Sequence, residues 1–239
     1  PAMTGSPAPG SNTTGSYTPG SHTPGSHAPG SSAAGTAVAD GPAATEAPAH
    51  VVHPVPAGLR PRGTVLVVPG RGENATVYTR LAARLNVDGY RVVVVDGDRA
   101  DLPALTSLVG ELIAVPAGSG SSPLVAIGSD TGAIAVHDLA VQGTPGLTGV
   151  VLAGLPVPRT SETAATAAGT AGTAGIPWHD ELDARTACPV HRERLNSDPR
   201  LARGALLREA VPAWTARRPP APALVLHGAS DVISPLHLL

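Results

Sequence analysis

The stretch Leu-Val-Ala-Ile-Gly-Ser-Asp-Thr-Gly-Ala-Ile-Ala-Val-His-Asp, Leu124–Asp138, decides the fold of this chain. Its first four residues, Leu124 to Ile127, are apolar and predict a buried strand. The residues that follow include two glycines, and after Gly132 the apolar side chains recur at helical spacing. The stretch therefore predicts a strand, a tight turn and a helix in succession.

The turn has the spacing of a nucleophile elbow, a strained strand-to-helix turn that presents a reactive side chain between small residues. Gly128 and Gly132 are small where the backbones of the strand and the helix must pass close together. The central residue is Asp130 rather than a serine. Ser129 fits the frame poorly, because the residues two positions away on either side are β-branched. The frame therefore points to Asp130, although an ordinary strand-to-helix connection with two glycines is the plainer interpretation.

Composition narrows the class of protein. The 239 residues suffice for one α/β domain and a tail, and a hydrophobic content of 42% suffices for a packed core. The chain has no Phe, and its 16 basic residues are all Arg, a bias typical of a high-GC bacterial genome. A net charge of −2 gives no argument for nucleic-acid binding. One cysteine, Cys188, excludes an internal disulfide and a cysteine-based metal cluster, and we expect no cofactor and no metal.

The sequence shows neither a membrane-spanning segment nor a signal peptide. No apolar run reaches the roughly 18 residues that a membrane-spanning helix needs. No charged segment followed by an apolar one opens the chain, so no signal peptide is visible. We therefore expect a cytoplasmic protein without an integral membrane segment.

The first 48 residues differ in composition from the rest. They repeat a five-residue unit of the type Gly-Ser-His-Thr-Pro, seen at 20–24, and carry no charge before Asp40. Such a segment cannot bury enough apolar surface to offset the entropy of ordering it. We expect residues 1–48 to be a disordered tail and residues 49–239 to form the folded domain.

Apolar runs and helical spacings alternate along residues 49–239. The pattern predicts a mainly parallel, doubly wound α/β sheet with right-handed crossovers. An insertion at about 157–221 interrupts the alternation; its first part is rich in Ala, Thr and Gly, and its second part is expected to be a solvated helical surface. The expected strands are a first strand or hairpin arm at 51–59, then 63–68, 91–96, 124–127, 149–153 and 223–227, and the expected helices are 76–85, 103–115 and the one after 132.

Three of the expected strands end in loops that are polar or rich in glycine. These loops are Pro69–Glu73, Gly128–Gly132 and His227–Asp231. Sites in open parallel sheets form at the carboxyl ends of the strands, so we expect the three loops to lie at one edge. Their order and spacing resemble the α/β-hydrolase superfamily, and within it the lysophospholipase and acylglycerol lipase branch. That branch carries His-Gly-x-Gly-Glu, matched here by Pro69–Glu73, and then a helix and a Gly-Tyr-x-Val strand, matched at 89–92.

The resemblance covers about residues 62–239 and implies a role for each loop. The backbone N–H groups of Arg71 and Thr131 would form the oxyanion hole. Asp130 would occupy the position of the nucleophile, and Asp231 that of the acid which orients a catalytic histidine. The 157–221 insertion would be a cap lining the pocket for a small-molecule or lipid-like substrate. The resemblance leaves the oligomeric state open.

The chain departs from the pattern of the branch in three places. The nucleophile position holds Asp130 instead of serine. The loop after Asp96 lacks the Arg-Gly-His-Gly turn of the branch. The final strand of the family and the histidine that follows it are absent, since His237 stands only six residues after Asp231. We therefore expect the 239-residue chain to be inactive as a hydrolase and to self-associate through the edge strand at 223–227.

An aspartate nucleophile leaves three functions open. In dehalogenases and epoxide hydrolases of this superfamily a carboxylate displaces halide or opens an epoxide. Attack on an ester would instead give an anhydride, from which a carboxylate of pKa about 4 leaves more readily than an alkoxide. However, the halide-binding Trp of dehalogenases is replaced by Thr131, and the expected cap has no tyrosine. The open functions are an ester hydrolase with an altered nucleophile, an Asp-nucleophile dehalogenase or epoxide hydrolase, and a non-catalytic binding relative of the fold.

Overall fold

A computed structural model describes residues 49–97, 101–114, 123–156, 177–208, 211–229, 231 and 233–234. The expected tail at 1–48, residues 115–122 before the strand expected at 124–127, the first part of the insertion and His237 lie outside the described residues.

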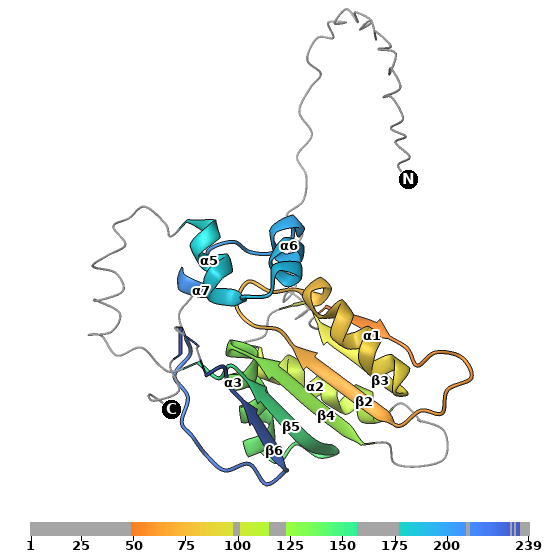
Figure 1. Cartoon of the computed structure of the whole chain (residues 1–239). Helices are drawn as coiled ribbons and strands as arrows, with labels where there is room; N and C mark the ends of the chain where they lie inside the picture. The colour runs from red at the N-terminus through yellow and green to blue at the C-terminus, as the bar shows by residue number, and fades with distance from the viewer. Residues whose placement is uncertain are drawn as a thin grey trace, which may run out of the picture. The chain divides into compact units, whose positions relative to one another are not determined.

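The described residues build a six-stranded sheet (Figure 1). The strands lie in the order β1-β3-β2-β4-β5-β6, and all neighbours are parallel except β1, which pairs antiparallel with β3. The predicted mainly parallel α/β sheet is therefore confirmed. The strands are β1 (His50–His53), β2 (Gly63–Val68), β3 (Tyr90–Val95), β4 (Leu124–Ser129), β5 (Leu147–Ala153) and β6 (Ala223–Leu226).

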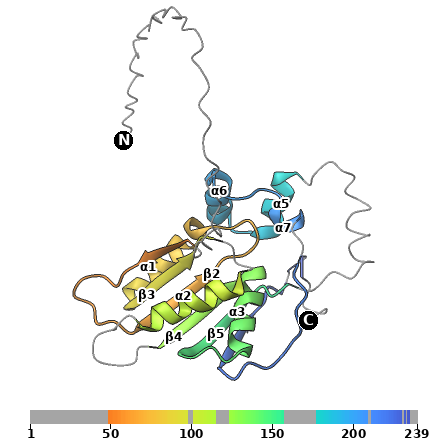
Figure 2. The ribbon, with the colours of Figure 1, turned by 180° about the vertical axis from the view of Figure 1, so that it is seen from behind.

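Helices cover both faces of this sheet. On one face lies α1 (Thr79–Val87), preceded by the short 3-10 helix η1 (Ala75–Tyr78). On the other face lie α2 (Leu102–Ala114) and α3 (Thr131–Val141), which are nearest the viewer in Figure 2. Because both faces are covered, the central strands are apolar without alternation, as their sequences predict.

The apolar core lies on both sides of β3. Val93 and Val95 belong to the cluster that also contains side chains of α2 and α3, whereas Val92 and Val94 belong to the cluster on the α1 side. Successive strand residues point to opposite faces, which explains this division. All four valines have no exposed surface, and burying one such side chain contributes about 1.5–3 kcal/mol.

Three helices of the described part of the insertion form a cap over the carboxyl ends of the strands (Figure 1). These helices are α5 (Trp178–Arg185), α6 (Pro189–Ser197) and α7 (Ala205–Arg208). Leu182, Leu195 and Leu201 form a small core of their own, against which Val77 of η1 packs. Because η1 lies in the segment that follows β2, this segment provides the contact between the cap and the rest of the domain.

The segment that leads from the cap back to β6 packs against the sheet and its helices rather than against the cap. Val211 and Trp214 pack against the main core, and the indole N–H of Trp214 donates to the carbonyl of Pro156 over 2.9 Å. His137 of α3 bonds the carbonyl of Arg217 over 2.9 Å. The last described cap helix, α7, covers Ala205–Arg208, and the described residues from Val211 to Arg217 contact the sheet side.

Three expected elements have other bounds in the structure. The first strand ends at His53, because Pro54 and Pro56 cannot donate to a ladder. The helix expected at 76–85 is a 3-10 turn, with Asn74 accepting the amide of Thr76 over 2.8 Å, followed by α1. The strand expected at 124–127 continues to Ser129, which pairs with Ala153 of β5.

Candidate functional site

The turn between β4 and α3 has the strained geometry expected of an elbow. Asp130 has φ 51° and ψ −122°, and it is the one residue other than glycine with positive φ in the described part of the chain. A Cβ on Gly128 would lie 2.3 Å from the carbonyl oxygen of Gly132. A Cβ on Gly132 would lie 2.2 Å from the carbonyl oxygen of Val68. Both glycines are therefore required for the close passage of backbones that places Asp130 at the tip of β4.

The carboxylate of Asp130 is bound by Arg71. The guanidinium Nε donates to Oδ2 over 2.7 Å, and Nη2 donates to Oδ1 over 2.7 Å. The backbone N–H of Arg71, expected to be an oxyanion-hole donor, also donates to Oδ2 over 3.0 Å. The side chain of Arg71 is 3% exposed and that of Asp130 is 17% exposed. One of the two amides expected to form an oxyanion hole is thus engaged by Asp130, while Thr131, which carries the other, opens α3 directly after it.

Glu73 holds the loop that carries Arg71. Its Oε2 accepts the amide of Gly70 over 2.9 Å and the hydroxyl of Tyr78 over 2.5 Å. Burial, and then the negative charge of Glu73, raise the pKa of Tyr78 well above 10.0. The phenol therefore stays protonated and donates to Glu73, which fixes the loop from the side of η1.

The cap holds the same loop from above. Arg185 of α5 donates from Nη2 to the carbonyl oxygen of Arg71 over 3.0 Å, and its Nη1 lies 3.8 Å from Oε1 of Glu73. Glu181, one turn earlier, accepts from Arg185 over 2.7 and 3.1 Å and has no exposed surface. The second part of the insertion is therefore not only a solvated surface, because this acid and this arginine are buried against the site.

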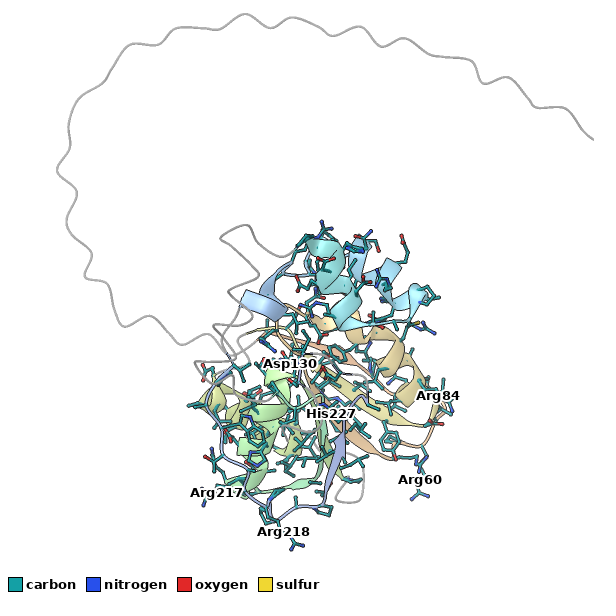
Figure 3. The ribbon with its side chains drawn as sticks, turned by 60° about the vertical axis from the view of Figure 1, so that its left-hand side comes forward. Arg60, Arg84, Asp130, Arg217, Arg218 and His227 are labelled. Carbon is teal, nitrogen blue, oxygen red and sulfur yellow. The ribbon has the colours of Figure 1, made fainter. Side chains whose placement is uncertain are left out.

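Asp231 lies in the loop after β6. Its Oδ1 accepts the amides of Ile233 over 2.8 Å and Ser234 over 2.9 Å. The Nε2 of His227 lies 3.7 Å from Oδ2 of Asp231 and 2.5 Å from the carbonyl oxygen of Ser234. His227 directly follows β6 and has a buried side chain, and Figure 3 shows it beside the end of the strand, with Asp130 beneath the cap.

A cavity of about 190 Å³ brings the predicted acids together between the strand ends and the cap. Asp130 and Asp231 both line it, as expected for residues that follow the carboxyl ends of parallel strands in one sheet. No histidine is among the described residues that line this cavity. The lining residues are Gly70, Arg71, Glu73, Ser129, Asp130, Ala153, Gly154, Ala184, Arg185, Leu206, Asp231, Ile233 and Ser234.

A second polar cluster joins the cap to the end of β3. Arg200 donates to Asp96 over 3.0 Å and to the amide oxygen of Asn74 over 3.1 Å. Burial acts to raise the pKa of Asp198, but hydrogen bonds from the Thr76 hydroxyl, the Arg200 amide and Asn74 outweigh it and lower this pKa. The cluster keeps the cap loop after α6 anchored on η1.

One group of side chains in the cap has donors that suit a metal ion. His179, Asp180 and Asp183 of α5 offer ligand atoms within 4.8 Å of one another. All three are exposed, and Asp183 is also paired with Arg192. Exposed groups of this kind are common without an ion, and we assign no metal to them.

No described helix is both long enough and apolar enough to cross a bilayer.

Asp130 and Asp231, which the sequence predicts as site residues, both line the cavity, but the sequence did not predict the side chains that contact Asp130 or hold its loop neighbour Arg71. The missed residues are the side chain of Arg71 and the side chains of Glu73, Tyr78, Glu181 and Arg185. A signal existed for the last two, since a Glu four residues before an Arg is a stabilising helical pair. For Arg71 no signal existed, because its partner lies 59 residues away.

The mainly parallel sheet, the elbow between β4 and α3, and the cap over the strand ends define an α/β-hydrolase-fold protein. The chain belongs to the serine aminopeptidase S33 family, whose model matches residues 59–237. Comparison with curated proteins finds no significant match. The resemblance to the α/β-hydrolase superfamily is thereby confirmed, and the chain is a member of a hydrolase family.

Solved structures of lipases share this fold. Monoglyceride lipase from Saccharomyces cerevisiae, solved with a substrate analogue, is 21% identical with a TM-score of 0.56 over 77% of this chain and 74% of its own. Monoacylglycerol lipase from Paleococcus ferrophilus is 20% identical with a TM-score of 0.55 over 80% of this chain and 81% of its own. Identities this low establish the similarity of fold and nothing further.

Proposed function

We propose that the protein acts on small carboxylic esters, in the manner of a lysophospholipase relative whose nucleophile position has been altered. Membership of a hydrolase family and the lipase-type fold support this substrate class. Asp130 at the elbow and Asp231 in the loop after β6 are the proposed site residues, and the amides of Arg71 and Thr131 are the proposed oxyanion donors.

The size and lining of the cavity favour a short acyl group. Ligand pockets usually measure roughly 300–1,000 Å³, whereas this cavity measures about 190 Å³. Ala153, Ala184, Leu206 and Ile233 provide the apolar part of its lining. An acetyl or butyryl ester fits these dimensions better than a long-chain acylglycerol does.

The contacts between Arg71 and the carboxylate of Asp130 are the main observation in support of an altered nucleophile position. A nucleophilic carboxylate needs an oxygen lone pair directed at the substrate, and here the two oxygens accept three N–H groups of Arg71. Attack on an ester would also give an anhydride that collapses back to reactants. We therefore expect ester turnover through Asp130 to be slow.

Two other functions each have one observation in their favour. The strained backbone of Asp130 costs about 1–3 kcal/mol, and such strain clusters at reactive positions, which favours an Asp nucleophile of the dehalogenase or epoxide hydrolase type. The contacts of Arg71 with both carboxylate oxygens of Asp130 favour a non-catalytic binding protein. The Arg71 contacts weigh against the former, because they occupy the carboxylate that would attack.

Hydrolysis of nitrophenyl acetate, butyrate and dodecanoate by the full chain tests the proposal. We expect turnover by this chain to be very slow or undetectable, in keeping with the inactivity expected from its sequence, and any turnover should fall as the acyl chain lengthens. Asp130→Asn should abolish this turnover, and Ser129→Ala should keep most of it. Asp180→Asn, on the exposed side of α5, is the matched control and should behave as the unaltered chain.

The outcomes separate the three functions. A dead Ser129→Ala variant would show that Asp130 is not the reactive position. Halide release from a bromoalkane, without ester turnover, would establish the dehalogenase function instead. No turnover of esters, alkyl halides or epoxides, together with saturable binding of the amide analogue of a short-chain ester, would establish the binding function.

A further inference from the structure

Arg71 offers three N–H groups to a single carboxylate. The guanidinium donates from Nε and Nη2 to separate oxygens, and the amide of the same residue donates to one of them. This forked arrangement matches a carboxylate in geometry as well as in charge. The side chain is 3% exposed, so the contact is made away from bulk water.

The donors of Arg71 are held in place by groups other than Asp130. Arg185 donates to the carbonyl of Arg71 over 3.0 Å. Glu73 accepts the preceding amide, that of Gly70, over 2.9 Å. The carbonyl of Gly72, the next residue, accepts the amide of Ala202 over 2.9 Å. The loop therefore has its shape from neighbours on both sides, and we expect it to keep that shape when the carboxylate is removed.

We propose that Arg71 forms a carboxylate-binding site, that Asp130 fills this site as an internal ligand, and that a small free carboxylate replaces Asp130 when its side chain is removed. In the unaltered chain the site is closed to carboxylates, because Asp130 occupies the donors and repels a second negative charge. The cavity then admits neutral ligands and does not retain an acid. This inference concerns the binding of anions and does not depend on any ester chemistry.

The Asp130→Gly variant tests the site directly. Glycine adopts positive φ without strain, so the elbow backbone can stay as it is while the carboxylate is lost. A ligand that binds only the folded state raises the melting temperature in a saturable manner. We expect sodium acetate to raise the melting temperature of Asp130→Gly in this way. Sodium chloride at equal ionic strength and acetamide, the neutral isostere, should have no saturable effect.

Three chains serve as controls. The unaltered chain and Asp130→Asn keep the space filled, and acetate should not stabilise them. The double variant Asp130→Gly/Arg71→Met lacks the fork, and it should also fail to respond. A response of equal size in the double variant, or an equal response to chloride or acetamide, would overturn the proposal.

The proposal also predicts the outcome if Asp130→Gly folds poorly. The variant then lacks the carboxylate that pairs with the buried guanidinium of Arg71. Acetate should supply this carboxylate and restore folding, as measured by circular dichroism and refolding yield. The same recovery should follow in Asp130→Ser, which keeps a small polar side chain at the elbow. If neither variant is stabilised or refolded by acetate beyond the effect of chloride, Arg71 is not a carboxylate site.

Discussion

At the scale of single residues, the contact between Arg71 and Asp130 determines what the site can do. The guanidinium is almost fully buried and the carboxylate is mostly buried. Removing one partner of a buried ion pair costs about 3–5 kcal/mol, because it leaves the other charge without its counter-ion. The 17% exposure of Asp130 moderates this cost, since water reaches part of the carboxylate.

Arg71→Met should therefore lower the free energy of unfolding by about 2–4 kcal/mol, somewhat below the range for fully buried pairs. Urea unfolding followed by circular dichroism measures this change. The double variant Arg71→Met/Asp130→Asn should recover part of the loss, because the remaining carboxylate charge is also removed. Losses that simply add in the double variant would mean that the pair is not coupled.

Asp198 should contribute to the dependence of stability on pH. Its pKa is lower in the folded protein than in the unfolded chain, so its contribution is present above the unfolded value of about 3.9. The contribution is lost as the pH falls through the lowered pKa. The melting temperature of Asp198→Asn should therefore lie below that of the unaltered chain at pH 7, and the difference should shrink below about pH 4. A difference that grows in acid would contradict the direction of this pKa change.

The position of Asp130 could be predicted from the sequence, but the partner of its carboxylate could not. The glycines at 128 and 132 predict the close passage of backbones, and the structure has that passage. The direction of the Arg71 side chain depends on the shape of the loop after β2, which the cap holds through Arg185. Spacing along the chain carries no information on such a contact.

At the scale of elements, the strands were the most predictable part. β2 has the predicted bounds, β3 is shifted by one residue, β5 starts two residues earlier and β6 ends one residue earlier than predicted. In β3, for example, a run of four consecutive valines is typical of a strand that is covered on both faces in a parallel sheet. The start of α1 was wrong by three residues, because the contacts of Asn74 and Asp96 with the amides of the 3-10 turn decide it.

The cap and the loop after β2 should move as one element. Arg185 and Glu181 connect α5 to the carbonyl of Arg71, so Arg185→Gln should weaken the hold on the loop. We expect faster hydrogen exchange of the amides at 70–73, measured by mass spectrometry, with a smaller change in the sheet. Arg192→Gln removes a more exposed ion pair on the same cap and should leave this exchange unchanged. Equal acceleration by the two variants would show that Arg185 has no special role in the loop.

At the scale of the whole molecule, the convergence of the three loops was predictable, as was the edge position of β6, but the antiparallel edge at β1 was not. Parallel strands end at one edge, and so Asp130 and Asp231 meet at one cavity although they lie in distant segments. The antiparallel pairing of β1 with β3 has no comparable rule, because a four-residue segment beside two prolines carries too little pattern.

Residues 1–47 should be dispensable for the stability of the domain. They lack the apolar periodicity with which a segment packs against a core. A shortened chain that starts at Pro48 should melt within a few degrees of the full chain, as measured by calorimetry. A larger decrease in melting temperature would mean that the tail contributes to the folded structure.

β6 should be a site of self-association. Within the described part of the sheet it is an edge strand, and its side chains Leu224, Val225 and Leu226 are 54%, 54% and 49% exposed. An apolar edge with unpaired backbone groups pairs readily with another strand, and a charge on the edge opposes this pairing. We expect the sedimentation coefficient of the unaltered chain to rise with protein concentration and that of Val225→Lys to rise less. Val190→Lys is the matched control, because Val190 is 62% exposed but lies on helix α6, and it should sediment as the unaltered chain. An unaltered chain that stays monomeric at all concentrations would show that this edge does not pair.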